Sequence, residues 1–133
     1  MLGGSLGQIG FCVKNSGAEN NAYTDAGIIK LNTWHHVAGV CDGKQIMMYV
    51  DGELKKANGF ALPIDKTDNV LTIGCNYHDA SRLEFFNGTI DELRISDIGR
   101  SQDEIQKMMK EGYTAPVEST GKVTTTWASI KAH

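Results

Sequence analysis

Apolar and polar residues alternate along several short runs of this chain, and a period of two is typical of β-strands. The clearest run covers residues 34–41 and is followed by Asp42-Gly43 and by a second alternating run over residues 45–50. Asp and Gly both accept the positive φ of a type I′ turn, so this pattern predicts a two-residue hairpin. Asp51-Gly52 repeats the signal before residues 53–56. Together the two turns predict an antiparallel meander.

Weaker patterns complete the expected set of elements. Residues 70–74 read as a strand with Leu71 and Ile73 facing inward. The other elements that we expect are strands over residues 6–14 and 23–30, a polar turn over 15–21, an irregular segment over 57–69 and a polar loop over 75–82.

Apolar and polar residues also alternate over residues 86–96, and this pattern places the Asp91 carboxylate on the more apolar side of the predicted strand. Asp91 shares its side of the predicted strand with Leu93 and Ile95, and this more apolar side is expected to face the core. An ionised carboxylate that leaves water needs a cation or several hydrogen-bond donors. We therefore expect Asp91 to be buried and to have a specific partner.

A short helix is predicted near the end of the chain. Ser101 and Glu104 have the spacing of a capping box, an apolar stripe begins at Ile105, and Gly112 ends the helix. The expected architecture is an all-β domain over residues 1–113, followed by a tail over residues 114–133. Within that tail, residues 123–127 either add an edge strand or stay outside the sheets.

Composition excludes several classes of partner. The 133 residues suit one domain, and a net charge of -3 without a basic run argues against nucleic acid. No apolar run approaches the roughly 20 residues of a membrane-spanning helix, so membrane insertion is not expected. The first residues lack the features of a signal peptide, which fits a cytoplasmic protein or a chain that lacks its N-terminal part.

Three cysteines, Cys12, Cys41 and Cys75, lie far apart in the sequence. An odd number excludes a complete disulfide framework within the chain. They read as small buried hydrophobic residues, and one bridge with one free thiol is the alternative.

The acidic residues do not form the pattern of a glycosidase. Retaining glycosidases place two carboxyl groups about 5–5.5 Å apart, which alternate positions on one strand can achieve. Asp91 and Glu92 are neighbours and face opposite ways, while Asp51 and Glu53 flank a turn glycine. His35 and His36 are also adjacent, so on a strand they face opposite sides and cannot form one metal site together. The sequence therefore predicts no catalytic residues.

Taken in order, several of these segments resemble a known family. The segments are Trp34 to Val40, Asp42-Gly43, Tyr49 to Gly52, Ile73-Gly74, Phe86 to Ile95 and the capping box. They look like the laminin-G-like jelly roll of the concanavalin A-like lectin/glucanase superfamily. The resemblance implies an antiparallel β-sandwich with one short C-terminal helix.

The chain departs from the family pattern before Trp34, where it has too little sequence for all the N-terminal strands. Unpaired strand edges attract other strands. The resemblance therefore implies association with a second copy of the chain, as a homodimer through those edges.

The resemblance also implies a set of binding residues. Asp91 corresponds to an acidic residue that helps to bind a structural calcium in related domains, and the alternative is that it accepts hydrogen bonds from backbone amides or from an arginine. Tyr49 is expected to line the concave sheet where relatives bind ligands. Trp34 is expected in the core, with sugar stacking as the alternative.

The loop that follows residue 75 carries the remaining candidates. An aromatic ring together with amide, imidazole and acid groups is chemistry that binds a sugar, although a solvated loop is the plainer interpretation. These candidate ligand-binding residues are Asn76, Tyr77, His78 and Asp79.

The function that this resemblance implies is a non-catalytic carbohydrate- or glycoprotein-binding module of a larger extracellular or cell-surface protein. The alternative is a structural or protein-interaction module that assembles through exposed sheet edges.

Glu92 and Arg94 lie on the face of the predicted strand opposite to Asp91. They are expected to form a surface ion pair.

Overall fold

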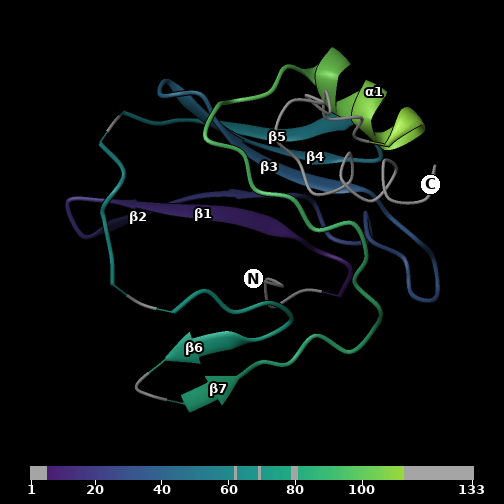
Figure 1. Ribbon diagram of the computed structural model, residues 1–133, viewed down its shortest axis with the longest axis horizontal. Coiled ribbons are helices and arrows are strands. Elements are labelled where there is room, and N and C mark those ends of the chain that lie inside the picture. Colours follow the sequence, from purple (N-terminus) through teal and green to yellow (C-terminus); the bar gives the residue numbers. More distant parts are fainter. Residues whose placement is uncertain (1–5, 62, 69, 79–80, 113–133) are drawn as a thin grey trace, which may run out of the picture.

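A computed structural model describes residues 6–61, 63–68, 70–78 and 81–112 (Figure 1). These residues contain seven strands and one helix, and every strand pair is antiparallel. The predicted all-β class with one short helix near the C-terminus is confirmed. The elements are β1 (Gly10–Asn15), β2 (Ala18–Tyr23), β3 (Val37–Cys41), β4 (Gln45–Val50), β5 (Glu53–Gly59), β6 (Asn76–His78), β7 (Ser81–Leu83) and α1 (Gln102–Glu111).

The strands form three small sheets, β1-β2, β3-β4-β5 and β6-β7. The β1-β2 hairpin lies against one face of the β3-β4-β5 sheet, and α1 lies on the other side of that sheet (Figure 1). The sheet therefore has a core on each face, and β4 contributes to both.

The core on the hairpin side is built by alternate residues of β4. Ile46 and Met48 are buried there with Ala22 from β2 and Phe60 from the segment after β5. Partly buried apolar residues of β1 pack against this cluster. The alternation predicted over residues 45–50 agrees with this arrangement, because the period of two places Ile46 and Met48 on one face and the residue between them on the other.

The core on the helix side joins Val40, Tyr49 and Ile105, and Ile105 is only 1% exposed. The capping box that holds the start of α1 is confirmed: the Ser101 hydroxyl accepts from the Glu104 amide, and the Glu104 carboxylate accepts from the Ser101 amide. Gly112 ends the helix with a φ of 68°, as predicted. A short amphipathic helix of this kind is stable mainly through its packing on the sheet.

The two Asp-Gly turns differ. Asp51 and Gly52 have φ values of 53° and 76°, so the predicted type I′ turn between β4 and β5 is confirmed. Between β3 and β4, however, only Gly43 has a positive φ, and the central residues are Gly43 and Lys44. The prediction was wrong by one residue, because the Asp42 carboxylate accepts the amides of the next residues in the turn and so stabilises a different hairpin loop.

In the N-terminal hairpin, β1 agrees with the strand expected over residues 6–14, but the turn and the second strand were predicted wrongly. The expected turn over residues 15–21 is confined to Ser16 and Gly17, and β2 occupies residues 18–23 in place of the expected strand over 23–30. Asp65 explains the tight turn, since its two carboxylate oxygens accept the amides of Ser16 and Gly17 at 2.8 Å each. Pairing with β1 thus overrides the weak strand propensity of Asn20 and Asn21.

Gly39 is required by the close approach of the two layers. A Cβ atom at this position of β3 would collide with the ring of Phe11, which lies over it from β1. The glycine therefore lets an aromatic ring of the hairpin pack directly on the edge strand.

The strands and the loop that we expected over residues 70–96 were predicted wrongly. Residues 70–74 and 86–96 form no strand, and Leu71 and Ile73 are exposed where they were expected to face inward. The segment over residues 75–82, expected to be a loop, instead contains the β6-β7 hairpin. Alternation can select a face for a side chain, but a strand also needs a neighbour to pair with.

The tail over residues 114–133, including the candidate edge strand at 123–127, lies outside the described residues. The domain boundary at residue 113 therefore stays a prediction. Within the described residues, no helix is long and apolar enough to cross a membrane.

We expect Ile105→Ala to loosen the attachment of α1 and to lower the free energy of unfolding by about 2–5 kcal/mol, because it empties a fully buried site. Chemical denaturation followed by circular dichroism measures this. Lys107→Ala, on the exposed side of the same helix, is the control and should change stability by less than about 0.5 kcal/mol. Equal effects of the two substitutions would contradict the packing described here.

Candidate functional site

Trp34 lies outside the core, contrary to the prediction. The indole is 69% exposed, because β3 begins at Val37 and Trp34 belongs to the loop before it. Leu31, in the same loop, is also exposed. Two exposed apolar side chains in one loop mark it as a candidate contact region.

The loop that carries Trp34 is held by specific hydrogen bonds. At its start, the amides of Gly27 and Ile29 donate to the carbonyl oxygens of Leu6 and Gly7. At its end, the Lys30 amide donates to Nε2 of His35 at 3.1 Å. Trp34 thus protrudes from a loop whose two ends are fixed to the fold.

The bonds of His35 define its tautomer. Because Nε2 accepts from the Lys30 amide, the proton of the neutral ring is on Nδ1, and Nδ1 donates to Oδ2 of Asp51 at 2.8 Å. The other oxygen of Asp51 accepts the amide of His36 at 2.9 Å. The β4-β5 turn and the Trp34 loop are therefore joined through a single carboxylate.

These contacts determine the direction in which the pKa of Asp51 is shifted. Partial burial raises the pKa of Asp51, but the hydrogen bonds from the His35 ring and the His36 amide lower it by more, and the net pKa lies below the usual aspartate value. Asp51 thus remains ionised at neutral pH and keeps both donors in place. The sequence indicated Asp51 only as a turn residue, and nothing in the linear pattern connects it to His35.

Tyr49 lies opposite Ile46 and Met48 on β4, as expected, but α1 covers this face. Tyr49 is only 5% exposed, and its hydroxyl donates to the sulfur of Met47. The predicted position in an open, ligand-lined sheet is wrong, because the helix fills that side of the sheet.

The candidates that follow residue 75 lie in and beside a strand. Asn76, Tyr77 and His78 form β6, and the Asn76 amide donates to Glu84 at 3.1 Å. Asp79 lies outside the described residues. Asn76, Tyr77 and His78 are thus consecutive residues of one strand. Their role in binding stays a prediction.

Asp91 is exposed, so the prediction that it faces the interior is wrong. No strand forms over residues 86–96, and no layer covers its carboxylate. Its Oδ1 accepts the amide of Glu92 at 2.8 Å, which is the backbone-amide alternative. The predicted ion pair between Glu92 and Arg94 is confirmed, with 2.7 Å between Oε2 and Nη2.

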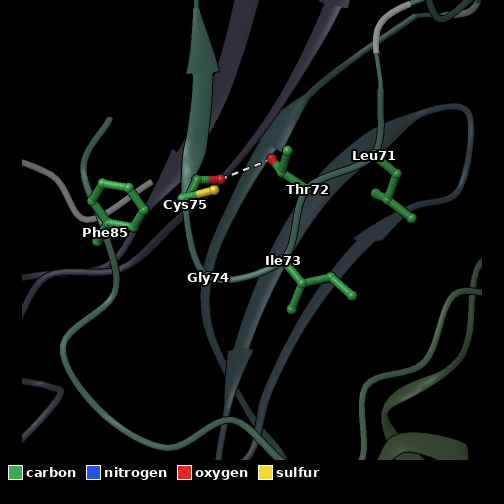
Figure 2. Close-up of a pocket in the computed structure, with 6 residues that line it drawn as sticks. All are labelled: Leu71, Thr72, Ile73, Gly74, Cys75 and Phe85. Atoms are coloured by element: carbon green, nitrogen blue, oxygen red, sulfur yellow. Dashed lines mark hydrogen bonds between the residues drawn. The ribbon is translucent and has the colours of Figure 1, made fainter. Parts of the chain in front are cut away.

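A shallow hollow of about 370 Å³ lies beside these exposed segments, and none of the side chains that line it is charged (Figure 2). Thr72 donates to the Cys75 carbonyl oxygen at 2.8 Å and so closes the bend at its edge. A surface of this composition contacts apolar groups and offers few hydrogen bonds to a sugar. Its lining residues are Leu71, Thr72, Ile73, Gly74, Cys75 and Phe85.

The three cysteines are free and each is partly buried. Cys41 packs against the core on the hairpin side, which fits the interpretation as a small hydrophobic residue. In the described residues, no group of three or more histidine, cysteine or acidic side chains is arranged to hold a metal ion.

Comparison with known proteins decides the family. The family model Laminin_G_3, described as the concanavalin A-like lectin/glucanases superfamily, matches residues 2–106. The chain belongs to this superfamily. No curated protein matches the chain. The membership confirms the resemblance stated above and agrees with the antiparallel, layered arrangement of the strands.

A solved structure is similar in sequence and in fold. It is an S-layer domain-containing protein from Clostridium thermocellum, with 27% sequence identity and a TM-score of 0.53. The match covers 77% of this chain and 51% of that chain. This laminin-G-like chain thus spans about half the length of the structure that it matches.

We expect Asp51→Asn to lower stability at neutral pH by about 1 kcal/mol, because the hydrogen bonds to a half-exposed carboxylate lose their charge. The folded pKa of Asp51 is depressed, so its contribution is complete above the unfolded pKa and disappears as the pH falls through the folded value. The two proteins should therefore converge in acid. Denaturation curves at several pH values measure this.

Asparagine tolerates the positive φ of the turn, so the backbone is kept while the charge and one of the two acceptor oxygens are lost. Asp68→Asn, an exposed carboxylate of another loop, is the control and should leave the pH dependence unchanged. A constant difference between wild type and Asp51→Asn from acid to neutral pH would contradict the account of Asp51.

Calcium at Asp91 stays a prediction with a direct test. If Asp91 is a calcium ligand, calcium should raise the thermal midpoint of the wild-type chain by several degrees and leave Asp91→Asn unchanged, since an ion that binds only the folded chain stabilises it. Glu92→Gln keeps Asp91 and serves as the control. A wild-type midpoint that does not respond to calcium, or an equal response of Asp91→Asn, would remove Asp91 as a ligand.

Proposed function

We propose that this chain is a non-catalytic recognition module of an extracellular or cell-surface protein, and that its ligand is a carbohydrate or a glycoprotein. Two findings support the proposal: membership in a superfamily described by its lectins and glucanases, and a structural relative that is an S-layer domain-containing protein. The exposed indole of Trp34 is the single structural observation on which the choice of ligand rests.

An exposed indole suits a sugar because its flat apolar face can stack on the C–H groups of the ring, while neighbouring polar groups bond to the hydroxyls. The Asp51 carboxylate, about half exposed, belongs to the turn that is bonded to this loop through His35. Fixing the loop before the ligand arrives lowers the entropy cost of binding. Trp34 is therefore the residue that we expect to contribute most to affinity.

The β6-β7 hairpin is the second surface included in the proposal. Asn76, Tyr77, His78 and Asp79 offer sugar-binding chemistry, and the hairpin is separated along the chain from the Trp34 loop. Tyr77→Ala therefore tests this surface independently of Trp34.

The contacts of the acidic residues support a non-catalytic role. Glycoside hydrolysis needs two carboxyl groups that face one bond, about 5–5.5 Å or 6.5–9.5 Å apart. Instead, the Asp51 carboxylate accepts a hydrogen bond from the His35 ring, Glu92 forms an ion pair with Arg94, and Glu104 caps the start of α1. Each of these carboxylates has a structural partner.

The experiment is a glycan array with the 133-residue chain and matched variants. We expect Trp34→Ala to lower the affinity for the bound glycans by at least about tenfold, as loss of an aromatic anchor does. Leu31→Ala, which removes an exposed apolar side chain from the same loop, should keep the wild-type profile. Trp34→Phe should bind with intermediate affinity, because a smaller aromatic face remains.

Three outcomes would contradict the proposal or part of it. A wild-type chain that binds no glycan or glycoprotein on the array removes carbohydrate recognition. Equal losses in Trp34→Ala and Leu31→Ala indicate a general disturbance of the loop. Loss in Tyr77→Ala with full binding by Trp34→Ala moves the site to the β6-β7 hairpin.

A further inference from the structure

Within the described residues, β4 is the strand that pairs with β3, and no strand pairs with the outer side of β3. The Asp51 amide donates to the His36 carbonyl oxygen, and the register pairs Val37 with Val50 and Gly39 with Met48. Because hydrogen-bonded and non-bonded pairs alternate in an antiparallel ladder, Val37, Gly39 and Cys41 direct their N–H and C=O groups away from β4. These backbone groups form the open edge of the β3-β4-β5 sheet.

Only part of the open edge is free for a partner. Gly99 lies close to the carbonyl oxygen of Cys41, since a Cβ atom on this glycine would come within 3.1 Å of it. This contact also agrees with the outward direction of the Cys41 carbonyl group. Val37 and Gly39 remain, and both are exposed.

The composition of the edge favours association. Residues 37–41 contain no charged residue and no proline, which are the usual means by which proteins protect an edge strand. At the other edge of the same sheet, β5 carries Lys55 and Lys56 and has a register shift opposite Met48 and Tyr49. One edge of the sheet is thus protected by charge and irregularity, and the other is not.

We propose that β3 pairs with β3 of a second copy of this chain, antiparallel, about a two-fold axis at Ala38. In this register Val37 of one copy faces Gly39 of the other, and each such pair exchanges both of its N–H···O bonds. The register leaves the Cys41 carbonyl group to Gly99. It extends the three-stranded sheet into one continuous sheet across the two copies.

A second copy is the occupant because this edge is complementary to itself. A two-fold axis at Ala38 pairs Val37 with Gly39 and Ala38 with Ala38, and it brings no like charges together along residues 37–39. Pairing β5 with itself would instead bring its lysines together, which is destabilising. Gly39 contributes no side chain to its pair with Val37, and the Phe11 ring lies where a Cβ atom of Gly39 would be.

The test compares two substitutions of equal exposure on the two edges. Val37 and Leu54 are 43% and 45% exposed, and they lie on β3 and β5. We expect the wild-type chain to dimerise reversibly in sedimentation velocity experiments, weakly, because the shared edge is short. Val37→Lys should raise the dissociation constant at least about tenfold, since it places a charge in the shared edge. Leu54→Lys should leave it unchanged.

Amide hydrogen exchange is a second measurement of this association. The Val37 and Gly39 amides should exchange more slowly as the concentration rises, because pairing gives these outward N–H groups a partner. Val37→Lys should remove this dependence while its circular dichroism spectrum matches the wild type.

A wild-type chain that stays monomeric up to millimolar concentration would overturn the inference. Equal weakening by the two lysine substitutions, or a dimer in which the Val37 and Gly39 amides exchange at the monomer rate, would also overturn it. Because Trp34→Ala tests ligand binding and Val37→Lys tests association, failure of the proposed function can be distinguished from failure of this inference.

Discussion

The structure depends on β4, which is the strand of the described residues that has a neighbour on each side and a core on each face. Ile46 and Met48 bury one face under the β1-β2 hairpin, while Tyr49 buries the other under α1. A strand in this position can have no charged residue on either face, and the sequence of β4 has none. The hairpin and the helix both pack on this ribbon of six residues.

The elements that could be predicted from the sequence are those whose cause is local. The Asp51-Gly52 turn requires two residues that accept a positive φ, and the capping box requires two side chains three positions apart. Both causes lie within four residues, so the sequence alone was sufficient. The faces of β4 were predicted for the same reason, because a period of two needs no knowledge of the partner strand.

Elements whose cause is distant were predicted wrongly. Asp91 shares its side with Leu93 and Ile95 in any extended conformation, but burial needs a layer to cover that side, and alternation does not supply one. β2 is the opposite case: Asn20 and Asn21 argue against a strand, yet pairing with β1 and the Asp65 carboxylate at the turn impose one. The bond between His35 and Asp51 also joins residues 16 positions apart. The composition of the loop gave no sign of it, so the most specific polar contact of the candidate site was missed.

Trp34 and the open edge of β3 are adjacent in sequence, and this has a consequence for recognition. A two-fold axis at Ala38 directs the two Trp34 loops toward opposite ends of the shared edge. Each Trp34 lies four positions before Ala38, so pairing would hold the two loops at a fixed separation. Two weak sites at a fixed separation bind a repetitive ligand far more tightly than one site does. Exposed, shallow contacts of the Trp34 type are weak individually, so edge pairing would give this small domain the avidity that its surface lacks.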